Sequence, residues 1–555
     1  MKSHYKKLLE YSDLAIEKTL KNQCMDVNSR EYGGFPTQLK GFTEPAHCIG
    51  GASTYMTLYY NSDSKYYHSE LLLDRAILAA NYSLNAMHDD GTVDLVETNF
   101  HDATSFGFSV WNVGPAYRVM KKYTTNSAKE QEVLAIFKQY LQRGADGIVN
   151  GGFHTPNHRW VLASALAILS NILERPELVD TLNLYTSEGI DCNEDGEFSE
   201  RSAGIYNVVN NRGLLFMAEE LDRFEYLDHV TRNLYMMFTY LEPDDTLLTI
   251  NSKRQDFGRE LYPLVYYDNY LLAAHYTKNK HFAYMADYLF NMTNDYVKDK
   301  SALNLLAFPK FLSKYMLHDF LREDELEKEA FDIEHYEHFY KESNIVRYRN
   351  NDMAITLLAQ NDIFLKLQYG TNQVSMRFAA SFFGDNGRFV SDKIEKTIAG
   401  YRLHYHCDWG YVKPLGKADH PIKDGHTNKE HRQPVLMQEY DVTMDIKLLE
   451  DGVNLNITTN SCDHLPYKVE FIYPSAGFFT CEQVQCQTSN GQHLLVKNGE
   501  YTYHKNGYTI KTDGAFGETT YHSTLRGSHP PIENAFTVFY TGFAPDKREI
   551  NIKIV

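Results

Sequence analysis

The chain has 555 residues, of which 43% are hydrophobic and 23% charged, a composition typical of a folded globular protein. A single hydrophobic core stops growing near about 250–300 residues, so two domains are expected. The 55 Lys and Arg against 73 Asp and Glu give a formal charge of −18, which disfavours a nucleic-acid partner. No apolar stretch is long enough to span a bilayer, so no membrane partner is expected.

Two features of the sequence bear on the cellular compartment. The first 20 residues have the pattern of an amphipathic helix and lack the apolar core of a signal peptide. We therefore expect a cytoplasmic protein, or a secreted or periplasmic one whose signal peptide has been removed. The seven cysteines are an odd number with neither a disulfide framework nor a CxxC pattern, which favours reduced thiols.

Residues 1–335 predict a helical domain. Apolar residues recur at i, i+3 and i+4, and short connections rich in Gly, Pro, Asn and Asp separate the helical segments. The clearest segments are 68–87, 106–122, 129–142, 160–173, 204–221, 261–277 and 282–296. Consecutive helices with short links imply antiparallel hairpins, and a closed ring of such hairpins is an α/α toroid. An open solenoid is the alternative, although no repeat of fixed period is present.

Residues 336–555 predict an antiparallel β-sandwich. The hydrophobic pattern changes to period two, in strands separated by turns such as NN, DNG, EDG, NG and DG. The boundary falls in the charged stretch 322–342, which is itself expected to be helical. The predicted fold class is therefore α+β, with the toroid first and the sandwich second.

The first candidate site is the stretch from Gly151 to Trp160. Thr155 and Pro156 predict a helix start, which places Asn157 and His158 in the first turn. The positive end of the helix disfavours imidazolium, so we expect a neutral His158 and a place for a bound carboxylate. An ordinary helical first turn is the alternative interpretation.

The second candidate runs from Asp195 to Tyr206. Asp195-Gly196 predicts a turn, and Tyr206 falls near the start of the next helix. With Arg201 or Arg212 nearby, Tyr206 is expected to lose its proton more easily than a free tyrosine. The alternative is a loop ion pair in which Tyr206 only packs.

Two further stretches carry suitable side chains. If residues 404–408 form a strand, then His404, His406 and Asp408 share one face, which suits a divalent metal or a catalytic surface. Residues 99–104 are expected to open another helix and to place His101 and Asp102 near its positive end. A polar sheet face and a simple helix cap are the respective alternatives.

These motifs, in this order, resemble the uronate polysaccharide lyases of the heparinase II/III and alginate-lyase group. The resemblance is carried by Asn157-His158, by the run from Asp195 to Tyr206, and by His404-x-His406-x-Asp408. It covers nearly the whole chain, including the order of toroid and β domain. The chain is also similar to lyases that remove rhamnose caps from glucuronate in plant arabinogalactans.

The resemblance implies β-elimination at a uronic acid, most simply glucuronate, and an oligo- or polysaccharide partner. The carboxylate must first be neutralised, which we assign to Asn157 with support from Arg159 or Arg201. Tyr206 is assigned the transfer of the C5 proton to the leaving oxygen, since both lie on one ring face in glucuronate. His158 is expected to assist as base or carboxylate partner, and His404 is implied as a second catalytic histidine.

The remaining assignments concern binding. The residues that complete the predicted substrate site are Glu200, His101, Asp102 and Arg212. The chemistry requires no cofactor, but the resemblance implies a structural divalent metal, zinc or calcium, held by His406, Asp424 and His464. A homo-oligomer is left open.

Two other functions fit the sequence. A glycoside hydrolase on an α/α toroid would need two carboxylates beside the scissile bond. The candidates for that pair are Asp102, Glu194, Asp195, Glu197 and Glu200. A glycan-binding protein without catalysis is the third possibility, and in that case the Tyr206 hydroxyl would be dispensable.

Overall fold

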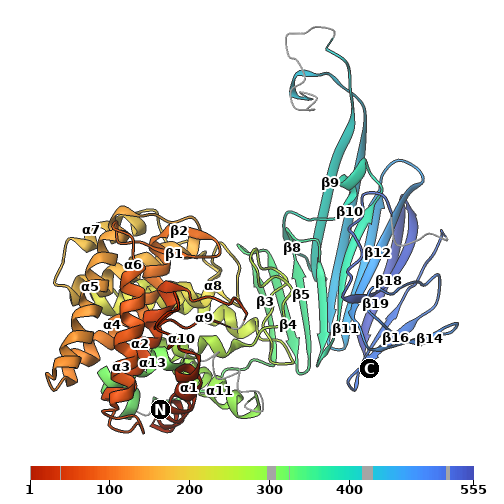
Figure 1. Ribbon diagram of the computed structural model, residues 1–555. Coiled ribbons are helices and arrows are strands. Elements are labelled where there is room, and N and C mark those ends of the chain that lie inside the picture. Colours follow the sequence, from red (N-terminus) through yellow and green to blue (C-terminus); the bar gives the residue numbers. More distant parts are fainter. Residues whose placement is uncertain (1, 38, 297–307, 324–325, 416–428, 520–524) are drawn as a thin grey trace. The chain divides into compact units, whose positions relative to one another are not determined.

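The protein folds into two compact units. The computed structural model describes residues 2–37, 39–296, 308–323, 326–415, 429–519 and 525–555. The first unit contains Met1–Phe238 and Ser252–Phe331, and the second contains Thr239–Asn251 and Asp332–Val555 (Figure 1). Each unit is described below by itself. In the part of the chain that the structure describes, no helix is both long enough and apolar enough to cross a membrane.

The first unit is an α/α toroid. Its larger helices are α1 (Lys2–Asn22), α2 (Pro45–Tyr60), α3 (Glu70–Asn85), α4 (Ala103–Tyr123), α5 (Ala128–Asn150), α6 (Pro156–Ile172), α7 (Leu178–Ser187), α8 (Tyr206–Leu221), α9 (Tyr226–Thr239), α10 (Tyr267–Thr277), α11 (Lys280–Tyr296) and α13 (Phe308–Leu317). The shorter elements are the strands β1 (Val93–Leu95) and β2 (Asn99–Asp102), the 3-10 helix η1 (Pro263–Tyr266) and the helix α14 (Asp319–Glu323). Helices α2, α4, α6, α8 and α10 pack one against the next, whereas α3 and α5 pack outside them. This alternation of inner and outer helices confirms the predicted ring of hairpins.

The helix boundaries follow from local capping chemistry. Helix α5 begins with a capping box in which the Ser127 side chain and Glu130 satisfy each other's backbone N–H groups. The Asp102 carboxylate accepts from the N–H groups of Thr104 and Ser105 at the start of α4. Helix α6 begins at Pro156, as predicted, and its interior positions are buried on all sides.

The second unit is a β-sandwich of two sheets. Its strands are β3 (His335–Tyr340), β4 (Ile345–Asn350), β5 (Met353–Leu358), β6 (Leu365–Tyr369), β7 (Asn372–Ala380), β8 (Ile394–Lys396), β9 (Tyr401–Val412), β10 (Pro434–Leu449), β11 (Gly452–Asn460), β12 (Leu465–Pro474), β13 (Phe478–Cys481), β14 (Gln485–Gln487), β15 (His493–Leu495), β16 (Tyr501–Lys505), β17 (Tyr508–Asp513), β18 (Ala535–Ala544) and β19 (Asp546–Ile554). One sheet has the order β14-β13-β16-β17-β19-β11-β10-β9-β8, and the other has the order β15-β18-β12-β7-β6-β5-β4-β3. The pairings are antiparallel except that between β15 and β18.

The alternating pattern of the strands builds the core of the sandwich. Buried side chains from the inner faces of both sheets, such as Leu367 and Phe471 from one and Leu455 and Ile552 from the other, form one continuous hydrophobic cluster. The period-two pattern therefore predicted this architecture correctly.

The structure corrects two details of the expected division. The segment Thr239–Asn251 was assigned to the helical domain, but it belongs to the second unit. Its Glu242 is buried against Arg347 of β4 and Lys366 of β6, with N–O distances of 3.1 and 2.9 Å. A buried carboxylate requires such partners, and they lie in the sheet. The stretch 322–342 is also not one helix, because α14 ends at Glu323 and β3 begins at His335.

We expect Glu242→Gln to lower the free energy of unfolding by about 3–5 kcal/mol, because Arg347 and Lys366 would then stay buried without a countercharge. Chemical denaturation followed by circular dichroism measures the change. The control is Asp451→Asn, which removes an exposed ion pair with Lys553 at 3.0 Å and should cost less than about 1 kcal/mol. Equal losses in the two variants would contradict this role of the buried carboxylate.

Candidate active site

A group of polar side chains gathers in the toroid where α4, α6 and α8 begin. Two loops also contribute side chains: the loop that leads into α8 supplies Glu200, and the loop after Asn251 supplies Arg254. We call the group the polar cluster. Its members are Asp102, Asn157, His158, Glu200, Tyr206 and Arg254.

Glu200 lies at the centre of the polar cluster and is buried. Its carboxylate accepts a hydrogen bond from the backbone N–H of Asn157 at 3.2 Å, and the Asn157 amide nitrogen lies 2.9 and 3.0 Å from its two oxygens. The Arg254 Nε lies 3.2 Å from the same carboxylate. Burial raises the pKa of the Glu200 carboxyl, an effect opposed by the Asn157 hydrogen bonds and the Arg254 charge.

Tyr206 is the first residue of α8 and is linked to Glu200 through Arg254. The Arg254 guanidinium lies 5.0 Å from the centre of the Tyr206 ring, within range of a cation–π contact. The Tyr206 hydroxyl accepts a hydrogen bond from Gln255 Nε2 at 3.1 Å. Asn157 and Tyr206 therefore belong to one continuous set of contacts.

His158, in the first turn of α6, faces the start of α4. Its Nδ1 lies 3.3 Å from the Thr104 hydroxyl, and its ring contacts the rings of His154 and Phe108. Burial, together with the charges of His154 and Arg254, lowers the pKa of His158 to about 4, although Asp102 opposes the shift. The ring is therefore neutral at pH 7.

Arg254 and Gln255 were not among the predicted residues. Their position depends on Asp256, whose buried carboxylate accepts from the Ser202 hydroxyl and the Gly204 N–H at 2.9 Å each. These bonds join two loops about fifty residues apart in the chain and hold Arg254 against Tyr206. A lone arginine in a polar loop carries no sequence signal that could have indicated this contact.

Two of the predicted arginines are paired with carboxylates of the chain itself. Arg159 Nη1 lies 3.2 Å from Glu188, and Arg201 Nε lies 3.1 Å from Glu197. Their side chains are only 11% and 13% exposed. Among the members of the polar cluster, the guanidinium is supplied by Arg254.

Of three other predicted residues, Asp102 belongs to the polar cluster, whereas His101 and Arg212 are not members of it. Asp102 caps α4 and acts electrostatically on His158. His101 does not open a helix as expected, because it lies in β2, where its ring stacks on His88 at 3.9 Å and its Nδ1 lies 2.6 Å from Asp90. Arg212 lies further along α8, in an ion pair with Asp268.

In the second unit, β9 places His404, His406 and Asp408 on one exposed face. Asp441 of the neighbouring β10 lies 3.2 Å from His404 Nε2 and 2.9 Å from His406 Nδ1. The catalytic role of His404 that the resemblance implies stays a prediction.

The proposed metal ligands do not form a centre within the described residues. Asp424 lies outside them. His406 contacts the carboxylates of Asp408 and Asp441, whereas His464 contacts the ring of Phe543. Over the described ranges, no group of three or more His, Cys, Asp or Glu side chains is arranged to hold a metal ion. Since Asp424 is not among the described residues, the implied zinc or calcium site stays a prediction, and no step is assigned to a metal.

A cavity of about 600 Å³ lies in the interior of the ring. Val209, one turn beyond Tyr206 on α8, lines it. Phe108 also lines it, and its ring centre is 6.4 Å from that of His158. Two helices, α8 and α4, therefore contribute residues to the cavity wall close to members of the polar cluster.

The comparisons with known proteins agree with this architecture. No protein-family model matches the sequence, and no curated protein matches it. Among solved structures, a heparinase III has 9% identity over 98% of this chain and 84% of its own, with a TM-score of 0.56. A chondroitin AC lyase of Streptomyces coelicolor A3, solved with chondroitin sulphate, has 12% identity over 99% and 79%, with a TM-score of 0.55. The chain therefore has the fold of these polysaccharide lyases.

The state of His158 can be measured directly. We expect its ring to titrate with a pKa of about 4 in the folded protein instead of the ordinary 6.5. In the unfolded chain His158 takes up a proton at higher pH than in the folded protein. The stability that comes from the neutral, buried His158 ring is therefore lost as the pH falls from about 6.5 toward 4. Histidine-selective NMR measures the titration, with the signal assigned by its loss in His158→Gln and with urea-unfolded protein as control. A folded-state value near 6.5 would contradict the described burial.

Proposed function

We propose that the protein is a polysaccharide lyase that cleaves the bond to O4 of a uronic acid by β-elimination. The observation that supports this most strongly is the chain of contacts from Asn157 through Glu200 and Arg254 to Tyr206. It combines a donor group for a carboxylate with a proton-transfer group, on a fold shared with polysaccharide lyases.

The first requirement of the reaction is neutralisation of the uronate carboxylate. The C5 hydrogen is very weakly acidic while the adjacent carboxylate keeps its charge. In this proposal Arg254 carries out the neutralisation. Its side chain is 28% exposed, and its Nε–H, although close to Glu200, donates no hydrogen bond within the described structure. Asn157 supports this by holding Glu200, and the raised pKa of that carboxyl favours its protonation when a second carboxylate binds.

The second requirement is movement of one proton. Tyr206, acting as the phenolate, takes the proton from C5. The electron pair left on C5 forms the C4–C5 double bond as the C4–O bond breaks, and Tyr206 gives the proton to the departing oxygen and so returns to the phenolate. No water is consumed. The hydrogen bond from Gln255 and the guanidinium over the ring stabilise negative charge on the phenol oxygen in the transition state. His158, neutral at pH 7, assists by accepting a proton or a hydrogen bond.

The use of a single tyrosine for both proton steps favours glucuronate. In glucuronate the C5 hydrogen and the 4-oxygen lie on the same face of the ring, so one phenol can reach both. A uronate with these groups on opposite faces would need a separate acid and base.

Tyr206→Phe should lower the turnover number by about 10²–10⁴-fold, because it removes the proton-transfer group and keeps the ring. Formation of the C4–C5 double bond is followed by ultraviolet absorbance on a panel of uronate-containing glycans. Tyr82→Phe, which removes a hydroxyl bonded to Glu31, is the matched control and should keep full activity. Full activity of Tyr206→Phe would exclude the assignment, and cleavage without an absorbing product would indicate hydrolysis instead.

Arg254→Gln should lower kcat/KM by about 10²-fold or more, because the carboxylate loses its charged partner as the reaction proceeds. Arg254→Lys should restore part of the loss, since the charge remains but the planar donor does not. Arg30→Gln, at a side chain 93% exposed, is the control and should leave the rate unchanged. Normal kinetics in Arg254→Gln would remove Arg254 from the proposed mechanism.

A further inference from the structure

The cavity inside the ring has an apolar aromatic wall. The rings of Phe108 and Trp111 meet edge-on with centres 5.4 Å apart, and Trp111 meets Phe216 in the same way at 5.7 Å. Small residues of α1 and α2, including Ala15 and Gly50, also line the cavity. Sugar rings pack their C–H faces on such surfaces, so this wall suits a pyranose.

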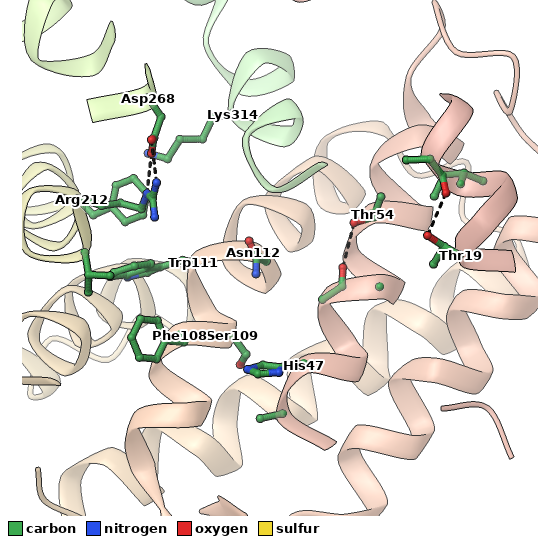
Figure 2. A pocket seen from close by; sticks show the side chains of 17 residues that line it. Thr19, His47, Thr54, Phe108, Ser109, Trp111, Asn112, Arg212, Asp268 and Lys314 are labelled. Atoms are coloured by element: carbon green, nitrogen blue, oxygen red, sulfur yellow. Dashed lines mark hydrogen bonds and ion pairs between the residues drawn. The ribbon is translucent and has the colours of Figure 1, made fainter. Parts of the chain in front are cut away.

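Asn112 provides an unsatisfied polar group in this cavity. The side chain lines the cavity, its residue is only 8% exposed, and its Oδ1 has no hydrogen-bond partner. Figure 2 shows Asn112 between Trp111 and Thr54. A buried amide oxygen without a partner is unfavourable, and a ligand hydroxyl would satisfy it.

The cationic side chains of the cavity wall are already neutralised. Arg212 donates two hydrogen bonds to Asp268, at 2.6 and 2.7 Å (Figure 2). The Lys314 ammonium is paired with Glu219, and it also lies 4.1 Å from the centre of the Phe216 ring. A sulphate group entering this cavity would lose water and meet cations whose charge is already balanced.

The cavity and the polar cluster share helix α8. Val209, which lines the cavity, lies three residues after Tyr206, so these two side chains occupy neighbouring positions on the helix surface, and Arg212 lines the cavity a further turn along. A sugar bound in the cavity is therefore next to a uronate held at Tyr206.

We propose that this cavity binds an uncharged, unsulphated sugar unit adjacent to the uronate, so that the substrate is an unsulphated glycan. This inference rests on the proposed function in one respect: the sugar unit bound at Tyr206 is taken to be a uronate. Asn112 is the group that recognises a hydroxyl of the neighbouring sugar, and the aromatic wall supports its ring.

The test is calorimetric titration of the full chain carrying Tyr206→Phe, which prevents turnover. The probes are tetrasaccharides of chondroitin, hyaluronan and heparosan, together with chondroitin 4-sulphate, chondroitin 6-sulphate and N-sulphated heparosan. At least one unsulphated probe should bind about tenfold more tightly than its sulphated counterpart.

Two variants test the cavity itself. Asn112→Leu should weaken binding of that probe about tenfold while the melting temperature stays equal or rises, because an unsatisfied buried amide is removed. Gly50→Leu should weaken it similarly by filling the cavity, since a Cβ at Gly50 meets only the Asn112 amide, at 3.7 Å. Ala128→Leu, at the exposed start of α5, is the control and should bind normally.

The outcomes separate this inference from the proposed function. Equal or tighter binding of the sulphated probes, no binding of any probe, or unchanged binding in both cavity variants would overturn the inference, whether or not the protein is a lyase. The expected binding pattern, with no unsaturated product from the unsubstituted enzyme, would support the inference and overturn the lyase.

Discussion

One buried carboxylate, that of Glu200, holds the polar cluster of the toroid together. Removing a carboxylate from water is strongly unfavourable unless several donors replace the lost hydration. Here Asn157 at the start of α6 donates the hydrogen bonds, and Arg254 in a distant loop supplies the countercharge. Because Arg254 also covers Tyr206, the requirement to neutralise one charge fixes the relative positions of three chain segments. The geometry of the site is thus a consequence of solvation energetics.

A second buried carboxylate, that of Asp256, is also satisfied by donors from another segment, and it lies two residues after Arg254. Asp256 accepts hydrogen bonds from Ser202, Gly204 and Ser252, and this fixes the approach to α8 before any ligand binds. Groups held in this way lose little conformational freedom during a reaction, which is how enzymes lower the cost of organising a transition state. The site is therefore preorganised by interactions that do not themselves take part in the chemistry.

The sequence predicted what depends on local patterns and missed what depends on distant pairs. Hydrophobic periodicity located the helices of the ring and the strands of the sandwich, and Pro156 marked the start of α6. Asn157 and Tyr206 could be put forward as candidates because each lies next to a helix start. The role of Arg254 was not predictable, since its contacts are with residues about fifty positions away. The loop ion pair that the sequence offered as an alternative for the second candidate is present between Arg201 and Glu197, because residues four apart can be paired from local spacing alone.

The chain between α9 and η1 passes from the helical unit into the sheet unit and back, which limits how the two units can be separated. After α9 the chain leaves the helical unit, contributes Thr239–Asn251 to the sheet unit, and returns at Ser252. No single cut can therefore release two intact halves: a fragment beginning at Asp332 would lack a segment of its own unit. Recombination that exchanges such modules must transfer two stretches of sequence together. Because Thr239–Asn251 lies within the sequence of the helical unit, the ring and the sandwich are expected to be exchanged together in evolution.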